Sequence, residues 1–159
     1  METKTDILSI DPGRKGGFAY WRQSKDFLDQ IELSKFTTES DFIDYVIRLD
    51  LTDLICVMED VPVFVSPLTK NSDSFKLGYN MGFEMGCVRT LQIPVHLIKP
   101  KDWQKGLQGL RPKMGYSDRK RALKDNAVRL FPKLKGITHA NCDALLILNY
   151  FRDNKILPK

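Results

Sequence analysis

Three acidic residues stand where a carboxylate could bind a metal ion. Asp11 ends an apolar run, residues 7–11, and a glycine-rich turn follows it. Glu59 ends a second apolar run, residues 54–59, and Asp143 opens an apolar segment near the C-terminus. A carboxylate beside apolar segments is costly unless something positive binds it. If the two runs are neighbouring strands of a sheet, Asp11 and Glu59 emerge at the same end, and we expect a divalent metal there.

An imidazole stands close to the third acid. His139 precedes Asp143 by four residues, so the two would project from one face of a helix. Two or three carboxylates with one imidazole can hold a pair of divalent metals, which assists displacement at a phosphate. Such ligands suit Mg²⁺ or Mn²⁺. We predict Asp11, Glu59, His139 and Asp143 as catalytic and metal-binding residues.

The elements that must position these residues alternate as in an α/β domain. Period-2 and apolar patterns predict strands at residues 7–11, 17–21, 27–36, 54–59 and 95–98. Capping residues and apolar stripes predict a helix from Thr38, further helices at 72–91, 117–130 and 138–152, and a helical turn from Pro100. Residues 61–71 and 107–116 are predicted loops. We expect one domain over residues 1–159, with a mixed sheet flanked by helices.

Basic residues are concentrated in one segment. Residues 99–135 contain twelve Lys or Arg against three acidic residues, so the remainder of this +5 chain carries a net charge of −4. Such a segment predicts a surface that binds a polyanion, although a merely solvated helix surface fits as well. DNA and RNA fit this pattern equally.

Three glycines share one face of the helix predicted at 72–91. Gly78, Gly82 and Gly86 are four residues apart, and each costs a helix about 1 kcal/mol relative to alanine. Their presence favours a close backbone neighbour, either the protein's own sheet or a second subunit.

Cysteine use and hydropathy place the chain in the cytoplasm. The three cysteines are widely spaced and form no Cys-x-x-Cys pair, which favours a reducing compartment without disulfides. No apolar stretch approaches the length of a membrane span, and we expect no membrane partner.

Taken together, these motifs resemble the RuvC family of Holliday junction resolvases, within the ribonuclease H-like superfamily. The resemblance spans most of the chain. The segments that carry it are residues 10–13 with Gly16 and Gly17, 57–59, 94–100 with Trp103 and Lys105, and 143–145. Each segment is short, but the four occur in the family's order. The element around Trp103 resembles phage-type members, which suggests a phage-encoded protein that acts in the host cytoplasm.

The resemblance implies a ribonuclease H-like fold whose five-stranded sheet has three antiparallel strands followed by parallel ones. It implies a crossover junction endodeoxyribonuclease, usually a homodimer, that uses two Mg²⁺ or Mn²⁺ ions to hydrolyse DNA at branched, four-way junctions. Asp11, Glu59 and Asp143 would be its metal-binding carboxylates. The family commonly has another acid three or four residues before the last one. Here those positions are Ala140 and His139, so His139 is the natural substitute.

The same resemblance assigns the remaining candidate residues. Phe64 and Phe75 could stack on unpaired bases, although the core or a subunit interface would suit them equally. The family's dimer helix corresponds to the segment of Gly78, Gly82 and Gly86, which favours a subunit contact there. The predicted phosphate contacts are Lys99, Lys101, Lys105, Arg111, Lys113, Arg119, Lys120, Arg121 and Lys124.

Three other functions fit parts of the sequence. A nuclease of the same fold could process structured RNA, and a protein with a disabled metal site could bind junctions without cleaving them. The first motif also resembles the phosphate turn of actin-like and sugar-kinase ATPases. Those proteins need two such domains, and 159 residues leave room for one.

Overall fold

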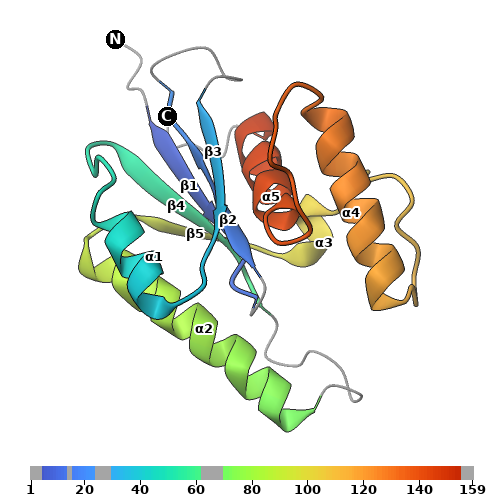
Figure 1. Cartoon of the computed structure of the whole chain (residues 1–159), viewed down its shortest axis with the longest axis horizontal. Coiled ribbons are helices and arrows are strands. Elements are labelled where there is room, and N and C mark those ends of the chain that lie inside the picture. The colour runs from blue at the N-terminus through green and yellow to red at the C-terminus, as the bar shows by residue number, and fades with distance from the viewer. Residues whose placement is uncertain (1–4, 14–15, 24–29, 62–69, 155–159) are drawn as a thin grey trace.

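A five-stranded mixed sheet lies at the centre of the computed structural model, which describes residues 5–13, 16–23, 30–61 and 70–154. The strand order is β3-β2-β1-β4-β5 (Figure 1). Strands β1, β2 and β3 pair antiparallel, whereas β1 pairs parallel with β4 and β4 with β5. The strands are β1 (Asp6–Ile10), β2 (Gly17–Trp21), β3 (Ile31–Lys35), β4 (Leu54–Glu59) and β5 (Val95–Ile98). The predicted α/β class, mixed sheet and ribonuclease H-like strand arrangement are confirmed.

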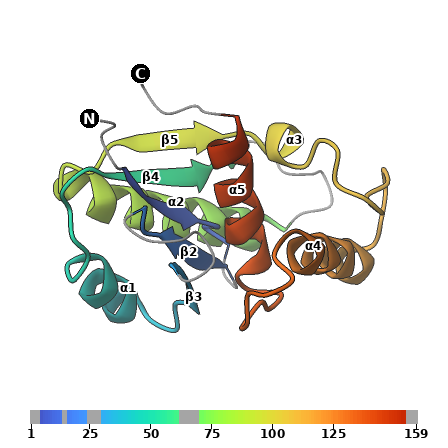
Figure 2. The ribbon, with the colours of Figure 1, turned by 90° about the horizontal axis from the view of Figure 1, so that it is seen from above.

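Helices cover both faces of this sheet. Helices α1 and α2 lie on one side and α3, α4 and α5 on the other (Figures 1 and 2). Their bounds are α1 (Glu39–Val46), α2 (Asn71–Thr90), α3 (Pro100–Trp103), α4 (Tyr116–Leu130) and α5 (Cys142–Asp153). No helix in the described part of the chain is long and apolar enough to cross a bilayer.

Alternation along the central strands divides the core into two layers. Ile7 of β1 and Val57 of β4 pack with α5 and Trp103, whereas Leu8 and Met58 pack in the layer that contains residues of α1 and α2. Successive side chains of a strand point to opposite faces, so strands covered on both sides must be apolar throughout. This explains why β1 and β4 lack polar alternation.

Local signals set the start of α1. The Thr38 hydroxyl accepts a hydrogen bond from the Asp41 amide, and the Asp41 carboxylate accepts one from the Thr38 amide. This capping box satisfies N–H groups that the first helical turn leaves unpaired. The predicted helix start at Thr38 is therefore confirmed.

Several predicted bounds differ from the structure by a few residues. Helices α2 and α4 each begin one residue earlier than predicted. Strand β3 occupies only the end of the predicted segment 27–36, of which residues 27–29 lie outside the described residues. All three cysteines are free, as predicted.

The predicted start of the last helix is wrong. Helix α5 begins at Cys142, not at Thr138, because the Asn141 side chain holds the preceding segment in a turn. Its Oδ1 accepts from the Thr138 amide at 2.8 Å, and its Nδ2 donates to the Gly136 carbonyl at 3.0 Å. His139 therefore lies in this turn and not on a helical face shared with Asp143.

Gly17, the first residue of β2, lies close to the backbone of two other segments. A Cβ there would lie 2.4 Å from the Ser34 carbonyl oxygen and 2.9 Å from that of Ala140. Both are backbone atoms that a side chain cannot displace cheaply. Gly17 therefore lets β3 and the turn before α5 approach β2 together.

We predict that Gly17→Ala lowers the free energy of unfolding by about 1–3 kcal/mol, the usual cost of overpacking. Chemical denaturation measures this change. Gly115→Ala is the matched control, since a Cβ there meets no described atom within 4 Å and its φ of −62° suits any residue. At this N-cap position of α4 the control should lower the free energy of unfolding by about 0.5 kcal/mol or less. Equal stability of Gly17→Ala and the wild type would contradict the close approach.

Candidate active site

Asp11 follows β1 directly and is turned toward α5. It continues the face of β1 that carries Ile7 and Ser9, and this face packs against α5. Its Oδ1 accepts a hydrogen bond of 3.2 Å from the Gly13 amide. Asp11 is only 9% exposed, so its carboxylate is held at the edge of the core.

Glu59 reaches the same edge of the sheet from β4. The parallel register pairs Ile10 with Met58, so the residues that follow, Asp11 and Glu59, emerge side by side. The Trp103 indole N–H donates a 2.9 Å hydrogen bond to Glu59 Oε2. Trp103 itself is buried, and this hydrogen bond fixes one oxygen of the carboxylate.

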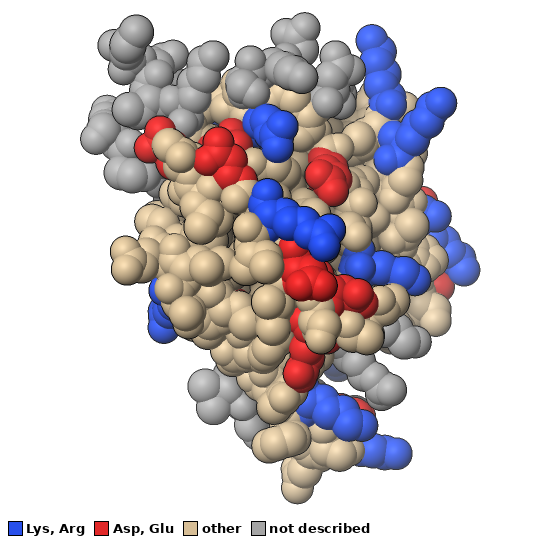
Figure 3. Space-filling view, turned by 60° about the vertical axis from the view of Figure 1, so that its left-hand side comes forward, with Lys and Arg blue, Asp and Glu red and all other residues tan. Residues whose placement is uncertain are grey.

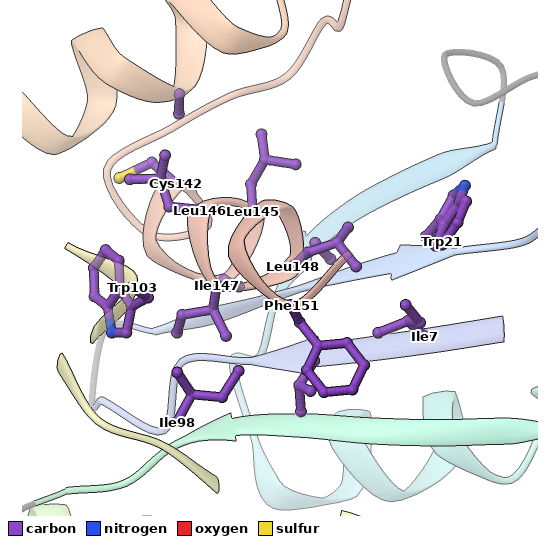
Figure 4. Packing of buried hydrophobic residues seen from close by; sticks show 14 of the residues in the cluster. Ile7, Trp21, Ile98, Trp103, Cys142, Leu145, Leu146, Ile147, Leu148 and Phe151 are labelled. Carbon is purple, nitrogen blue, oxygen red and sulfur yellow. The ribbon is translucent and has the colours of Figure 1, made fainter. Parts of the chain in front are cut away.

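Asp143 comes from the first turn of α5. The Ser9 hydroxyl donates a 2.7 Å hydrogen bond to the Ala144 carbonyl, which ties α5 to β1 beside the acid. The apolar side of α5 packs on the sheet below it (Figure 4). An acid in the first turn also faces the positive end of the helix dipole. Three elements distant in sequence thus bring Asp11, Glu59 and Asp143 together.

The same pocket receives a lysine from α4. Lys120 Nζ lies 2.6 Å from Asp143 Oδ2 and 3.9 Å from Asp11 Oδ2. Sequence reasoning placed Lys120 among the phosphate contacts and missed its pairing with the acids. No sequence signal shows that this face of α4 turns toward the pocket, because that depends on how α4 packs against α5.

All three acids line one open pocket of about 550 Å³. Its other described lining residues come from the turn after β1, from α2 and from α4. Of these, the sequence indicated only Gly13, in the first motif, and Lys120. The described residues that line it are Asp11, Gly13, Glu59, Asp73, Lys76, Leu77, Tyr116, Lys120 and Asp143.

Burial and the repulsion between neighbouring carboxylates raise the pKa values of Asp11 and Glu59. Burial, followed by the charge of Asp143, raises the pKa of Asp11 to about 6. Burial, followed by the charge of Asp11, raises the pKa of Glu59 to about 7, against the lowering effect of the Trp103 hydrogen bond. Burial opposes the charge of Lys120, but Asp143 and Asp11 outweigh it and raise the pKa of its ammonium.

The pocket has the chemistry of a cation site without a finished coordination shell. Across the described ranges, no three or more His, Cys, Asp or Glu side chains are arranged so that they could hold a metal ion. Yet carboxylate oxygens are the ligands that Mg²⁺ and Mn²⁺ prefer. The raised pKa values of Asp11 and Glu59 show that more positive charge would stabilise their ionised forms. The donor set therefore fits a divalent cation.

Other predicted site residues lie away from these acids. His139 is exposed and is not among the residues that line the pocket. Phe64 lies outside the described residues, whereas Phe75 is 73% exposed on α2, so its predicted alternative as a core residue is wrong. The Phe75 ring stacks on that of Tyr79, with centroids 6.3 Å apart.

The predicted phosphate contacts lie between the end of β5 and the middle of α4. Arg119, Lys120 and Lys124 are partly buried, and Arg119 donates a hydrogen bond to Gln104. The exposed members are Lys99, Lys101, Lys105, Arg111, Lys113 and Arg121. On the face shown in Figure 3, Lys and Arg side chains border a band of Asp and Glu. A polyanion that approached this face would meet both charges.

No described residue packs closely against the three glycines of α2. A Cβ built on Gly78, Gly82 or Gly86 would meet no described atom within 4 Å. The predicted alternative that the protein's own sheet packs against them is therefore wrong. Beside Gly82 and Gly86, an apolar groove of about 500 Å³ runs between α1 and α2.

The fold and site define an α/β protein of ribonuclease H-like fold with an acidic pocket at the end of β1 and β4. No protein-family model matches the chain, and no curated protein matches it in sequence. The structure is similar to Thermus thermophilus RuvC in complex with a Holliday junction substrate, with a TM-score of 0.60 and 16% identity. The match covers 94% of this chain and 96% of that one.

A second solved structure, of Thermus thermophilus RuvC, matches with a TM-score of 0.55 and 14% identity, over 95% of this chain and 97% of that one. Identities this low show a shared fold. This chain has the fold of RuvC along nearly its whole length.

We predict that, with a chelator present, the stability of the protein falls as pH rises from 5 to 7. The folded-state pKa of Glu59, about 7, lies above its ordinary value of 4.5, so the folded state binds the proton more tightly. The Glu59 contribution is therefore present at low pH and lost as pH rises through 7. It amounts to about 2 kcal/mol over this range.

Chemical denaturation of the wild type and Glu59→Gln at several pH values measures this contribution. Between pH 5 and 7, the free energy of unfolding of Glu59→Gln should fall by about 2 kcal/mol less than that of the wild type. Glu32→Gln, which alters an exposed glutamate of β3, is the matched control and should keep the wild-type slope. Parallel curves for wild type and Glu59→Gln would show that burial does not protonate Glu59.

Proposed function

We propose that this protein is a metal-dependent endonuclease that resolves four-way and other branched DNA junctions. The observation that carries the proposal is the convergence of Asp11, Glu59 and Asp143 on one pocket, in a fold shared with RuvC over 94% of the chain. One of the two RuvC structures is a complex with a Holliday junction substrate. The basic segment supplies the charge that binding DNA requires.

In this proposal, Asp11, Glu59 and Asp143 hold Mg²⁺ or Mn²⁺. A pair of such ions activates water and stabilises the leaving oxygen of a phosphodiester. Two hydrogen bonds within the chain orient the carboxylates that would bind the metal. Trp103 fixes one oxygen of Glu59, and Gly13 fixes one oxygen of Asp11. His139 stays the proposed fourth ligand, and it would have to reach the pocket from the turn before α5.

Lys120 has two tasks in the proposed reaction. Its ammonium pairs with Asp143 and, from 3.9 Å, lowers the pKa of Asp11 against the effect of burial. A DNA phosphate that entered the pocket would meet the same ammonium. Lys120 therefore belongs to the proposed active site as well as to the DNA-binding surface.

The exposed basic residues would hold the arms of the junction through phosphates, which position DNA without reading its sequence. Two exposed aromatic residues, Tyr116 of α4 at the pocket and Phe75 of α2 outside it, present rings on which unpaired bases could stack.

A homodimer would place two active sites on one junction. The exposed glycine face of α2 and the groove beside it form an apolar surface, to which Ile43, Ile47, Phe83 and Leu91 contribute. We propose that a second copy packs here, glycine face against glycine face. Twofold symmetry then pairs two identical sites with two opposed strands.

We predict that Asp11→Asn loses cleavage of a synthetic four-way junction with Mg²⁺ or Mn²⁺, by about 100-fold or more, because the variant lacks a ligand charge. Gel-based cleavage measures the rate, and gel shift in Ca²⁺ should show that the variant still binds DNA. Glu32→Gln, an exposed change on β3 outside both the pocket and the basic segment, should keep the wild-type rate.

The wild type should cut the four-way junction faster than a Y-fork, plain duplex or RNA hairpin. Wild-type rates in Asp11→Asn would refute the site. Preference for the RNA hairpin would instead indicate an RNA-processing nuclease. Binding without cleavage by the wild type would indicate a junction-binding protein.

We predict that Gly82→Arg converts the dimer to a monomer of 18.3 kDa, because a charged side chain would enter the subunit contact. The change fits the isolated chain, since a Cβ at Gly82 meets no atom within 4 Å. Analytical ultracentrifugation measures the mass. Ser117→Arg adds the same charge on α4, across the sheet, and should remain dimeric. A monomeric wild type, or a dimeric Gly82→Arg, would refute this contact.

A further inference from the structure

Glu84 of α2 is a buried acid that the proposed reaction does not use. Its side chain is only 4% exposed, and its Oε2 has no hydrogen-bond partner among the described residues. Burial, followed by the charge of Asp11, raises its pKa to about 9. Leaving a buried carboxyl oxygen unpaired costs free energy, so a group that would pair with it is expected.

Glu84 lines a cavity of about 180 Å³ that is separate from the acidic pocket. The cavity lies between α2, the start of α1 and the turn after β1. Among the described residues, its polar lining consists of oxygen-bearing groups, from Gly13, Thr37, Thr38, Glu39, Asn80 and Glu84. Within the described part of the chain, no lysine or arginine lines the cavity.

Two of these side chains stand in register on one helix. Asn80 and Glu84 are four residues apart, so they lie on the same face of α2. Glu39 faces them from the first turn of α1, and the Tyr79 hydroxyl donates a 2.9 Å hydrogen bond to its Oε1. The cavity thus has two carboxylates and an amide, supplied by two helices.

We propose that this cavity is a second cation site, in which Glu84, Asn80 and Glu39 bind a hard divalent ion such as Mn²⁺, Mg²⁺ or Ca²⁺. Oxygen donors without nitrogen or sulfur select ions of this class. The ion pairs with the unpartnered Glu84 oxygen and links α2 to the start of α1. Gly13 lines both cavities, so the ion lies behind the turn that carries Asp11. Its charge there stabilises ionised Asp11.

The test separates this site from the proposed active site. The double variant Asp11→Asn, Asp143→Asn removes two acids of the acidic pocket and leaves the Glu84 cavity intact. Mn²⁺ binding is measured without DNA, by calorimetry and by the loss of the free-Mn²⁺ signal in electron paramagnetic resonance. The double variant should retain one bound Mn²⁺ per chain. This result does not depend on whether the protein cleaves DNA.

Glu84→Gln in the same background should weaken this Mn²⁺ binding by about 10-fold or more, because glutamine keeps the shape but removes the charge. Glu32→Gln is the matched control and should leave binding unchanged. Glu39→Gln should weaken it by a smaller factor, which keeps the test valid if Glu84→Gln fails to fold. Absence of Mn²⁺ binding in the double variant, or unchanged binding in Glu84→Gln, would overturn the proposal and show that Glu84 holds a proton instead.

Discussion

The parallel pairing of β1 with β4 is the interaction on which the acidic pocket depends. The pairing aligns the ends of two strands that are 48 positions apart at Ile10 and Met58. The register also puts Asp11 and Glu59 on the face that α5 covers. A shift of one residue would turn one of the two acids to the opposite face of the sheet, where α1 and α2 pack. Ser9 of β1 opposes such a shift, because its hydroxyl would lose the hydrogen bond to the Ala144 carbonyl and enter the apolar layer on the other face.

Acids gathered in this way repel one another, and the surrounding residues offset only part of the cost. Lys120, Gly13 and Trp103 each stabilise the charged form of a carboxylate. Burial still dominates at Asp11 and Glu59 and raises their pKa values. Stability alone would not select this arrangement. A pocket that lowers the stability of its own charged form is typical of a functional site.

Much of this could be predicted from the sequence because it depends on local patterns. Strand ends, the capping box at Thr38 and the acids at positions 11, 59 and 143 are visible in short segments. The start of α5 could not be predicted in this way. The Asn141 side chain forms hydrogen bonds with the Thr138 amide and the Gly136 carbonyl, and these hold the preceding backbone in a turn instead of a helix. The roles of Lys120 and Glu84 also escaped prediction. Each role depends on the rotation of a helix about its own axis when the helix packs. A short segment of sequence does not determine that rotation.

The hydrogen bond from Trp103 to Glu59 gives the protein an optical property. An indole whose N–H donates to a carboxylate emits according to the charge on that carboxylate. The chain has two tryptophans, and the other, Trp21, lies at the far end of the α5 layer (Figure 4). Fluorescence from Trp103 therefore carries a signal from inside the acidic pocket. Whatever binds these acids can be followed in solution without attaching a dye.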